Sequence, residues 1–137
     1  MKYNFKKVVV TGGAGCIGLP LSRELADRGV EVVLFDLHEQ ISVVKSYIDK
    51  RVETFSGSIL DSSAIREAMI GCDAVVHLAA HLGVKRTEVN KLRCLDINID
   101  GTRKVLEASI TNGDIKKFIF ASSSEVYGEP LKNPISE

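Results

Sequence analysis

The stretch VVVTGGAGCIG, Val8 to Gly18, decides the fold. Three β-branched residues lead into a turn with four glycines, and an apolar pattern typical of a helix follows. Read as GxxGxxG, the spaced glycines are Gly12, Gly15 and Gly18. The first allows a tight turn, the second lets backbone approach a pyrophosphate, and the third lets the helix pack against the strand. The stretch therefore predicts a strand, a dinucleotide-binding turn and a helix.

The start of that helix is the expected anion site. The amide groups around Cys16 and Ile17 have no helical partner and point toward a bound diphosphate, with the helix dipole behind them. A P-loop is excluded because GGAGCIG lacks the Gly-Lys-Ser/Thr ending. A tight strand–helix turn that binds nothing stays open as an alternative.

An acidic residue at the end of the second predicted strand favours the binding interpretation. Asp36 stands 18 residues after Gly18. A carboxylate there accepts hydrogen bonds from ribose hydroxyls and repels a 2′-phosphate. No arginine directly follows it, only Leu37 and His38, so NAD is favoured over NADP. The alternative for Asp36 is a simple turn residue.

Strands alternate with helices along the whole chain. The apolar runs predict strands over residues 7–11, 32–35, 52–55, 74–78 and 118–121. The helical patterns cover residues 16–28, 41–48, 62–70 and 92–110. In the first helix, Ile17, Leu21 and Leu25 form the apolar stripe, and Pro20 removes at most one hydrogen bond. The order predicts an α/β fold, a doubly wound parallel sheet of the Rossmann type, in one domain over residues 1–137.

The bulk composition agrees with one globular domain and excludes several classes of partner. The 137 residues are 45% hydrophobic and 26% charged, with zero formal net charge. We expect no nucleic-acid or membrane partner, because nothing provides the electrostatic attraction or the span. The three cysteines, Cys16, Cys72 and Cys94, are far apart and unpaired by motif. A disulfide framework or zinc site is therefore not predicted, and a cytoplasmic location is expected.

Six short motifs together resemble the extended short-chain dehydrogenase/reductase family, which includes nucleotide-sugar epimerases, 4,6-dehydratases and decarboxylases. The motifs follow the family's order and span nearly the whole chain. They are TGGAGCIG at 11–18, the strand-end acid at 36, GSILD at 57–61, HLAA at 77–80, NIDGT at 98–102 and SSSEVYG at 122–128. The resemblance implies NAD as cofactor and a nucleotide sugar as substrate.

The resemblance also implies roles for individual residues. The cofactor contacts that it implies come from Gly12, Gly15, Cys16, Ile17 and Gly18 at the pyrophosphate, Asp36 with Leu37 at the ribose, Ser58 and Ile59 beside the adenine, and Leu78, Ala79 and Ala80 under the nicotinamide ribose. Asn98 matches an asparagine that holds backbone on a neighbouring strand. The family commonly has Asp at the position of Ser58, and a hydroxyl accepts from the adenine amine less strongly.

The SSSEVYG motif implies the catalytic residues. Ser123 matches the Ser or Thr that hydrogen-bonds the sugar hydroxyl or ketone. Glu125 matches a glutamate that assists proton transfer in dehydratases but has no such task in decarboxylases and some epimerases. His77 and His81 lack the spacing of a shared metal site, and packing in the loop and against the cofactor explains them.

One expected motif is missing. The family's Tyr-x-x-x-Lys pair, in which the lysine lowers the pKa of the tyrosine, is absent, since none of Tyr3, Tyr47 and Tyr127 has a lysine four residues later. The chain resembles the N-terminal part of such an enzyme, with the Rossmann sheet truncated before its last strands. We expect no turnover by these residues alone, and self-association or a homodimer through the 92–110 helix. A noncatalytic NAD-binding module and a reductase of small carbonyls remain alternatives.

Overall fold

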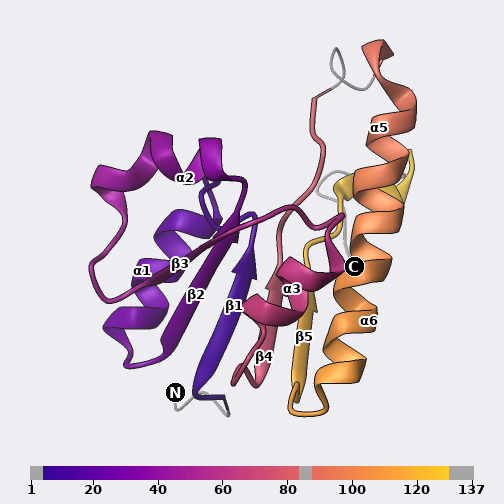
Figure 1. Cartoon of the computed structure of the whole chain (residues 1–137). Helices are drawn as coiled ribbons and strands as arrows, with labels where there is room; N and C mark the ends of the chain where they lie inside the picture. The colour runs from indigo at the N-terminus through magenta and orange to yellow at the C-terminus, as the bar shows by residue number, and fades with distance from the viewer. Residues whose placement is uncertain (1–4, 84–87, 130–137) are drawn as a thin grey trace.

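The computed structural model describes residues 5–83 and 88–129, except the side chains of 124 and 125. Its centre is one sheet of five parallel strands in the order β3-β2-β1-β4-β5 (Figure 1). The strands are β1 (Lys7–Thr11), β2 (Glu31–Asp36), β3 (Glu53–Ser56), β4 (Ala74–His77) and β5 (Lys117–Phe120). The predicted doubly wound sheet is confirmed.

The strand order places a topological switch between β1 and β4. From β1 the chain moves outward to β2 and β3, then returns to pair β4 on the other side of β1. The last residue of β1, Thr11, is in register with Phe35 of β2 and His77 of β4. Ligands of such sheets bind outside the carboxyl ends of the strands, at this switch.

Helices cover both faces of the sheet (Figure 1). Helix α1 (Gly18–Asp27) lies on one face, and α3 (Ser62–Ala68) and α6 (Thr102–Asn112) lie on the other. The shorter elements are α2 (His38–Val44), η1 (Lys45–Tyr47), α5 (Lys91–Leu95), the π-helical segment η2 (Asp96–Gly101) and η3 (Ser124–Tyr127). α5, η2 and α6 follow one another without a break in helical backbone.

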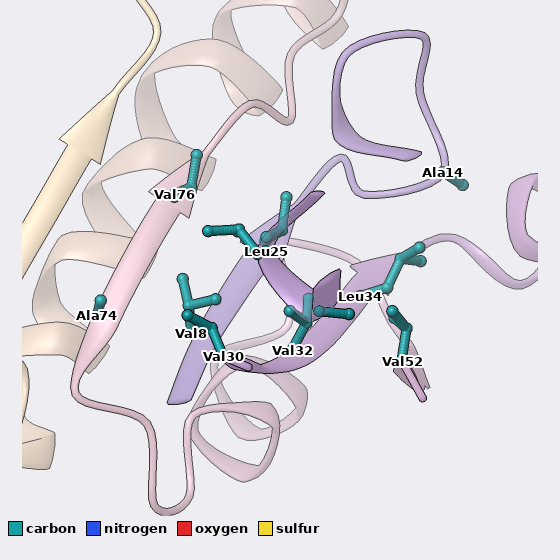
Figure 2. Close-up of a cluster of buried hydrophobic side chains, with 11 residues drawn as sticks. Val8, Ala14, Leu25, Val30, Val32, Leu34, Val52, Ala74 and Val76 are labelled. Carbon is teal, nitrogen blue, oxygen red and sulfur yellow. The ribbon is translucent and has the colours of Figure 1, made fainter. Parts of the chain in front are cut away.

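Alternation along the strands divides the interior into two cores. Val8 and Val10 of β1 face α1, whereas Val9 between them faces α3 and α6. The first core, drawn in Figure 2, comprises Val8, Val10, Ala14, Leu25, Ala26, Val30, Val32, Leu34, Val52, Ala74 and Val76. The second comprises Val9, Val33, Phe35, Ile59, Ile65, Ala68, Met69, Cys72, Val75, Val105 and Ala108. Central strands buried on both faces explain the unbroken apolar runs in the sequence.

The first helix differs from its prediction in two respects. It begins at Gly18, not at residue 16, and the side chain of Ile17 is 63% exposed. Ile17 on the apolar stripe was therefore wrong, and the buried positions are Gly18, Ser22, Leu25 and Ala26. The later start also puts Pro20 within the first turn, where no helical acceptor exists for its missing N–H.

The other predicted elements exist with shifted ends. The predicted 41–48 helix is α2 followed by η1, and the 92–110 helix contains the π-helical turn and extends to Asn112. Asp61 caps α3, accepting from the amides of Ser63 (2.9 Å) and Ala64 (3.2 Å). An exposed apolar row does run along the last long helix, through Leu92, Leu95, Ile99, Leu106 and Ile110. Self-association through this row stays a prediction.

Candidate functional site

The glycine turn is packed against the end of β4. Gly12 has φ +68°, a left-handed conformation that favours glycine. A Cβ on Gly12 would lie 2.7 Å from the amide nitrogen of Ala79 and 2.9 Å from the carbonyl carbon of Leu78. The tight turn is confirmed, and it brings the backbones of the β1 and β4 ends into direct contact.

The third glycine of the motif packs differently from our prediction. A Cβ on Gly18 would lie 2.5 Å from the carbonyl oxygen of Gly12 and 2.6 Å from Cα of Gly13. The start of the helix therefore packs against the turn at Gly18, and the helix reaches the strands further along, through Leu25 and Ala26. Gly13, which the spacing did not single out, is equally constrained, because its Cβ would meet Cγ of Leu34 at 2.6 Å. The closest contact for a Cβ on Gly15 is the Gly12 carbonyl at 3.1 Å, and Gly15 is exposed.

Some backbone amides of the glycine turn donate hydrogen bonds within the protein, and others do not. Gly13 donates to the carbonyl of Phe35 (3.2 Å), and Gly15 donates to the carbonyl of Gly12 (3.0 Å). The amides of Cys16 and Ile17 donate no hydrogen bond within the part of the chain that the structure describes. These two N–H groups, at the start of α1, can therefore hold an anionic group.

Asp36 connects the end of β2 to this turn. Its Oδ2 accepts from the amide of Ala14 at 3.0 Å, and its Oδ1 accepts from the amide of Leu37 at 2.8 Å. Each carboxylate oxygen keeps lone-pair capacity for another donor, and the residue is half-buried. The carboxylate therefore orders the glycine turn while it can still accept from ribose hydroxyls. The Leu37 side chain is exposed beside it.

The two residues expected beside an adenine have structural contacts of their own. The hydroxyl oxygen of Ser58 accepts from the amide of Leu60 at 3.1 Å. Ile59 is buried in the second core, where it fills the space that a side chain at Gly101 would need, since a Cβ there would lie 2.6 Å from Ile59 Cδ1. The Ile59 side chain therefore belongs to the core, and the Ser58 hydroxyl donates no hydrogen bond within the described residues.

The tail that follows β4 is bonded to the end of β1. The amide of Leu78 donates to the Thr11 carbonyl at 3.1 Å, and the amide of Ala79 donates to Thr11 Oγ1 at 3.3 Å. Leu78 and Ala79 are half-buried, and Ala80 is exposed. The small residues let this tail approach Gly12, so the predicted strand end does lie beside the glycine turn.

His77 is a buried residue of β4, so its explanation by packing in a loop was wrong. The residue is 1% exposed, and its ring stacks on Phe120 with centroids 5.8 Å apart. Nδ1 lies 2.6 Å from Thr11 Oγ1, and Nε2 lies 3.0 Å from Thr102 Oγ1. Burial lowers the pKa of His77 to about 4, so the ring is neutral at pH 7.

Asn98 holds the tail at a second point. Its Oδ1 accepts from the amide of His81 at 2.7 Å, and its Nδ2 donates to the His81 carbonyl at 3.2 Å and to Cys94 Sγ at 3.3 Å. The expected holding of neighbouring backbone is thus present, although the held residue lies four positions beyond the end of β4. Asn98 reaches it from the π-helical segment, a type of turn often found at functional sites.

The SSSEVYG residues follow β5 at the same edge of the sheet. Ser123 is exposed, and its carbonyl accepts from the amide of Val126 at 3.2 Å. Glu125 lies in η3, and its side chain is outside the described residues. Within the described ranges, no group of three or more His, Cys, Asp or Glu could hold a metal ion. Nor does any described helix have the length and apolarity needed to cross a membrane.

Sequence reasoning missed the steric role of Gly13 and three side chains whose hydrogen bonds hold this edge together, those of Thr11, His77 and Thr102. Gly13 had a signal, as the fourth glycine of the turn. The sequence signal for Thr11 was weak: it is a polar residue at the end of an apolar strand. His77 and Thr102 stand in the quoted motifs HLAA and NIDGT, but nothing local indicates their pairing, because it joins residues 25 positions apart.

A five-stranded doubly wound sheet with a glycine turn, unused helix-start amides and a strand-end carboxylate defines a Rossmann-type dinucleotide-binding domain. Residues 8–137 match the family model described as "NAD dependent epimerase/dehydratase family". The chain belongs to this family, and the expected family resemblance and its cofactor, NAD, are confirmed at this level.

Similar proteins include a decarboxylase and epimerases. The chain is 40% identical over 133 residues to a UDP-N-acetyl-alpha-D-glucosaminuronate decarboxylase of Bacillus cytotoxicus, covering 96% of this chain and 40% of that protein. The solved structure of epimerase Mth375 from Methanothermobacter thermautotrophicus matches with TM-score 0.86 and 35% identity, over 98% of this chain and 40% of that one. UDP-glucose 4-epimerase from Bifidobacterium longum, solved with NAD+ and UDP, matches with TM-score 0.84 and 29% identity, over 96% and 41%. The chain thus spans about 40% of the length of these relatives.

Proposed function

We propose that these residues bind NAD for a nucleotide-sugar epimerase or dehydratase, at the edge of the sheet where β1 and β4 end. The observation that carries the proposal is the pair of unused amides at Cys16 and Ile17, beside a carboxylate that is itself fixed to the turn at Ala14. Amides and a helix N-terminus suit a diphosphate, and the carboxylate suits ribose hydroxyls. The close backbone approach at Gly12 keeps side chains out of the same space.

Each group at the edge has a proposed task. The Cys16 and Ile17 amides hold the diphosphate, Asp36 accepts from the adenosine ribose, and Ser58 donates or accepts at the adenine. Leu78, Ala79 and Ala80 carry the nicotinamide end, with Asn98 fixing their tail through His81. NAD, when bound, would accept a hydride from C4 of the sugar and later return that hydride to the sugar.

Ser123 and Glu125 are the proposed substrate-facing residues. A hydroxyl at Ser123 donates a hydrogen bond to the C4 oxygen of the sugar, which favours the build-up of negative charge there. Glu125 moves a proton beside the ketone if the enzyme is a dehydratase. The 137 residues contain no Tyr-x-x-x-Lys pair, so we expect no turnover from them alone.

A nucleotide-sugar decarboxylase is the second candidate. The 40% identity to a decarboxylase favours it. In that case the cofactor edge works in the same way, and Glu125 has no proton-transfer task.

Calorimetric titration with NAD and with NADP tests the proposal on the 137-residue chain. We expect NAD to bind more tightly than NADP. Asp36→Ala should weaken NAD binding about ten- to a hundredfold, because charge-assisted hydrogen bonds to the ribose are lost, and should remove the preference over NADP. Asp114→Ala, an exposed acid beyond the far end of α6, is the matched control and should bind as wild type. Equal NAD affinity of Asp36→Ala and wild type would contradict the proposal.

Thiol labelling gives an independent readout of the same site. Cys16 is exposed beside the unused amides, so saturating NAD should slow its alkylation. Cys72 is buried, and burial raises the pKa of its thiol to about 11, so it serves as an unreactive internal reference.

A further inference from the structure

The proposed function makes no use of His77, a buried titratable side chain at the switch point of the sheet. Its ring is enclosed by the aromatic side chains of β5, with Phe118 at 6.2 Å and Phe120 at 5.8 Å between centroids. Desolvation of the buried ring is the cause of its lowered pKa. Both ring nitrogens have hydrogen-bond partners, Nδ1 with Thr11 and Nε2 with Thr102.

The hydrogen-bond partners of His77 fix where every hydrogen lies. Thr102 donates its single hydroxyl hydrogen to the Asn98 carbonyl at 2.7 Å, so Thr102 Oγ1 can only accept from His77 Nε2–H. In a neutral ring Nδ1 is then an acceptor, and it takes the hydroxyl hydrogen of Thr11. The Thr11 oxygen in turn accepts from the Ala79 amide. Hydrogen-bond donation therefore runs in one direction: Ala79 donates to Thr11, Thr11 to His77, His77 to Thr102, and Thr102 to the Asn98 carbonyl.

This chain of bonds joins the two attachments of the β4 tail. Thr11, the residue immediately before the left-handed Gly12, holds the tail by accepting from the Ala79 amide. Asn98 holds it at His81 from the π-helical segment. The His77 ring lies between Thr11 and Thr102, so it ties the end of β1 to the start of α6. No other described side chain donates to one of these two hydroxyls while accepting from the other.

We propose that His77, as the neutral Nε2–H tautomer, is a positioning residue that fixes residues 78–81 under the cofactor by joining Thr11 to Thr102. The proposal rests on NAD binding at this edge. It gives His77 no contact with cofactor or substrate. Because the hydroxyl hydrogen of Thr102 is already donated to Asn98, the Nδ1–H tautomer would break the bond to Thr102, and the cationic ring would reverse the direction of the bond to Thr11.

Thr102→Val and its matched control Thr102→Ser test the proposal in the 137-residue chain. Valine removes the acceptor of His77 Nε2–H, whereas serine keeps a hydroxyl in its place. Three measurements are made: the tautomer of His77 from ¹⁵N chemical shifts, hydrogen exchange of the Ala79 and His81 amides, and calorimetric affinity for NAD. We expect Thr102→Ser to match wild type. Thr102→Val should exchange both amides about five- to tenfold faster and bind NAD about five- to tenfold more weakly, the effect of one or two lost hydrogen bonds.

If Thr102→Val does not fold, His77→Asn replaces it, since asparagine keeps an acceptor near Thr11 but does not reach Thr102. An Nδ1–H or cationic ring in the wild type at pH 7 would overturn the proposal. Equal amide exchange in the valine and serine variants would also overturn it. If the wild type binds no NAD, the proposed function fails, and the tautomer and exchange measurements still decide the role of His77.

Discussion

The ends of β1 and β4 lie side by side at the candidate site but are stabilised in different ways. At β1 the glycine turn depends on missing side chains, since Cβ atoms at Gly12 and Gly18 would lie within 3.0 Å of backbone. At β4 the tail depends on polar side chains, through Thr11, His77 and Asn98. The edge of the sheet where β1 and β4 end thus combines steric exclusion on one strand with a directed hydrogen-bond network on the next. A side chain added in the glycine turn should therefore lower stability sharply. The stability that the hydrogen-bond network at β4 provides should instead depend on pH.

The largest effect is expected from Gly12→Ala. The new Cβ would be strained by the left-handed backbone and would clash with backbone atoms of Ala79 and Leu78, which cannot shift without disturbing the sheet. We expect the free energy of unfolding to fall by about 3–5 kcal/mol, measured by urea denaturation. Gly29→Ala is the matched control, because Gly29 has φ +79° but nothing within 4 Å of a Cβ. It should cost only about 1 kcal/mol. Equal losses in the two variants would show that steric exclusion at β1 is unimportant.

The pH dependence of stability tests the β4 side. The pKa of His77 falls from 6.5 in the unfolded chain to about 4 in the folded protein. The unfolded state therefore binds more protons between these values, and stability should decrease as pH falls from 6.5 to about 4. The His77 contribution to this loss is about 3 kcal/mol. Urea denaturation across this range should give a flatter curve for His77→Gln than for wild type, and parallel curves would contradict the assignment.

The smallest effect concerns the helix that the glycine turn begins. Ser22 of α1 is buried, and its hydroxyl has no hydrogen-bond partner within the described residues. Ser22→Ala should raise the free energy of unfolding by about 1 kcal/mol, since it removes an unpaired buried hydroxyl and favours the helix. Ser109→Ala is the control, because Ser109 is also buried in a helix but donates to the Val105 carbonyl at 2.8 Å. It should show no comparable gain in thermal or urea denaturation.

Most of the fold could be predicted from local patterns. The apolar runs predicted β1, β2 and β4 because strands buried on both faces need apolar residues at nearly every position. The edge strands β3 and β5 were predicted from shorter apolar runs and are largely exposed. The helix start at residue 16 was wrong because the spacing of Ile17 fits a helix, whereas the backbone there is still part of the turn. The π-helical turn within the 92–110 pattern was missed because one extra residue per turn hardly changes the apolar spacing over this length.

The glycine turn, the acid at Asp36 and the alternation of strands and helices could all be predicted from local sequence. Each depends on local requirements: a left-handed φ at Gly12, a strand that ends at a carboxylate, and a repeating apolar pattern. The contact of Asp36 with the Ala14 amide and the link that His77 makes between Thr11 and Thr102 became visible only in the folded protein. Those contacts join residues far apart along the chain, and the direction of each hydrogen bond depends on partners that only the folded sheet brings within reach.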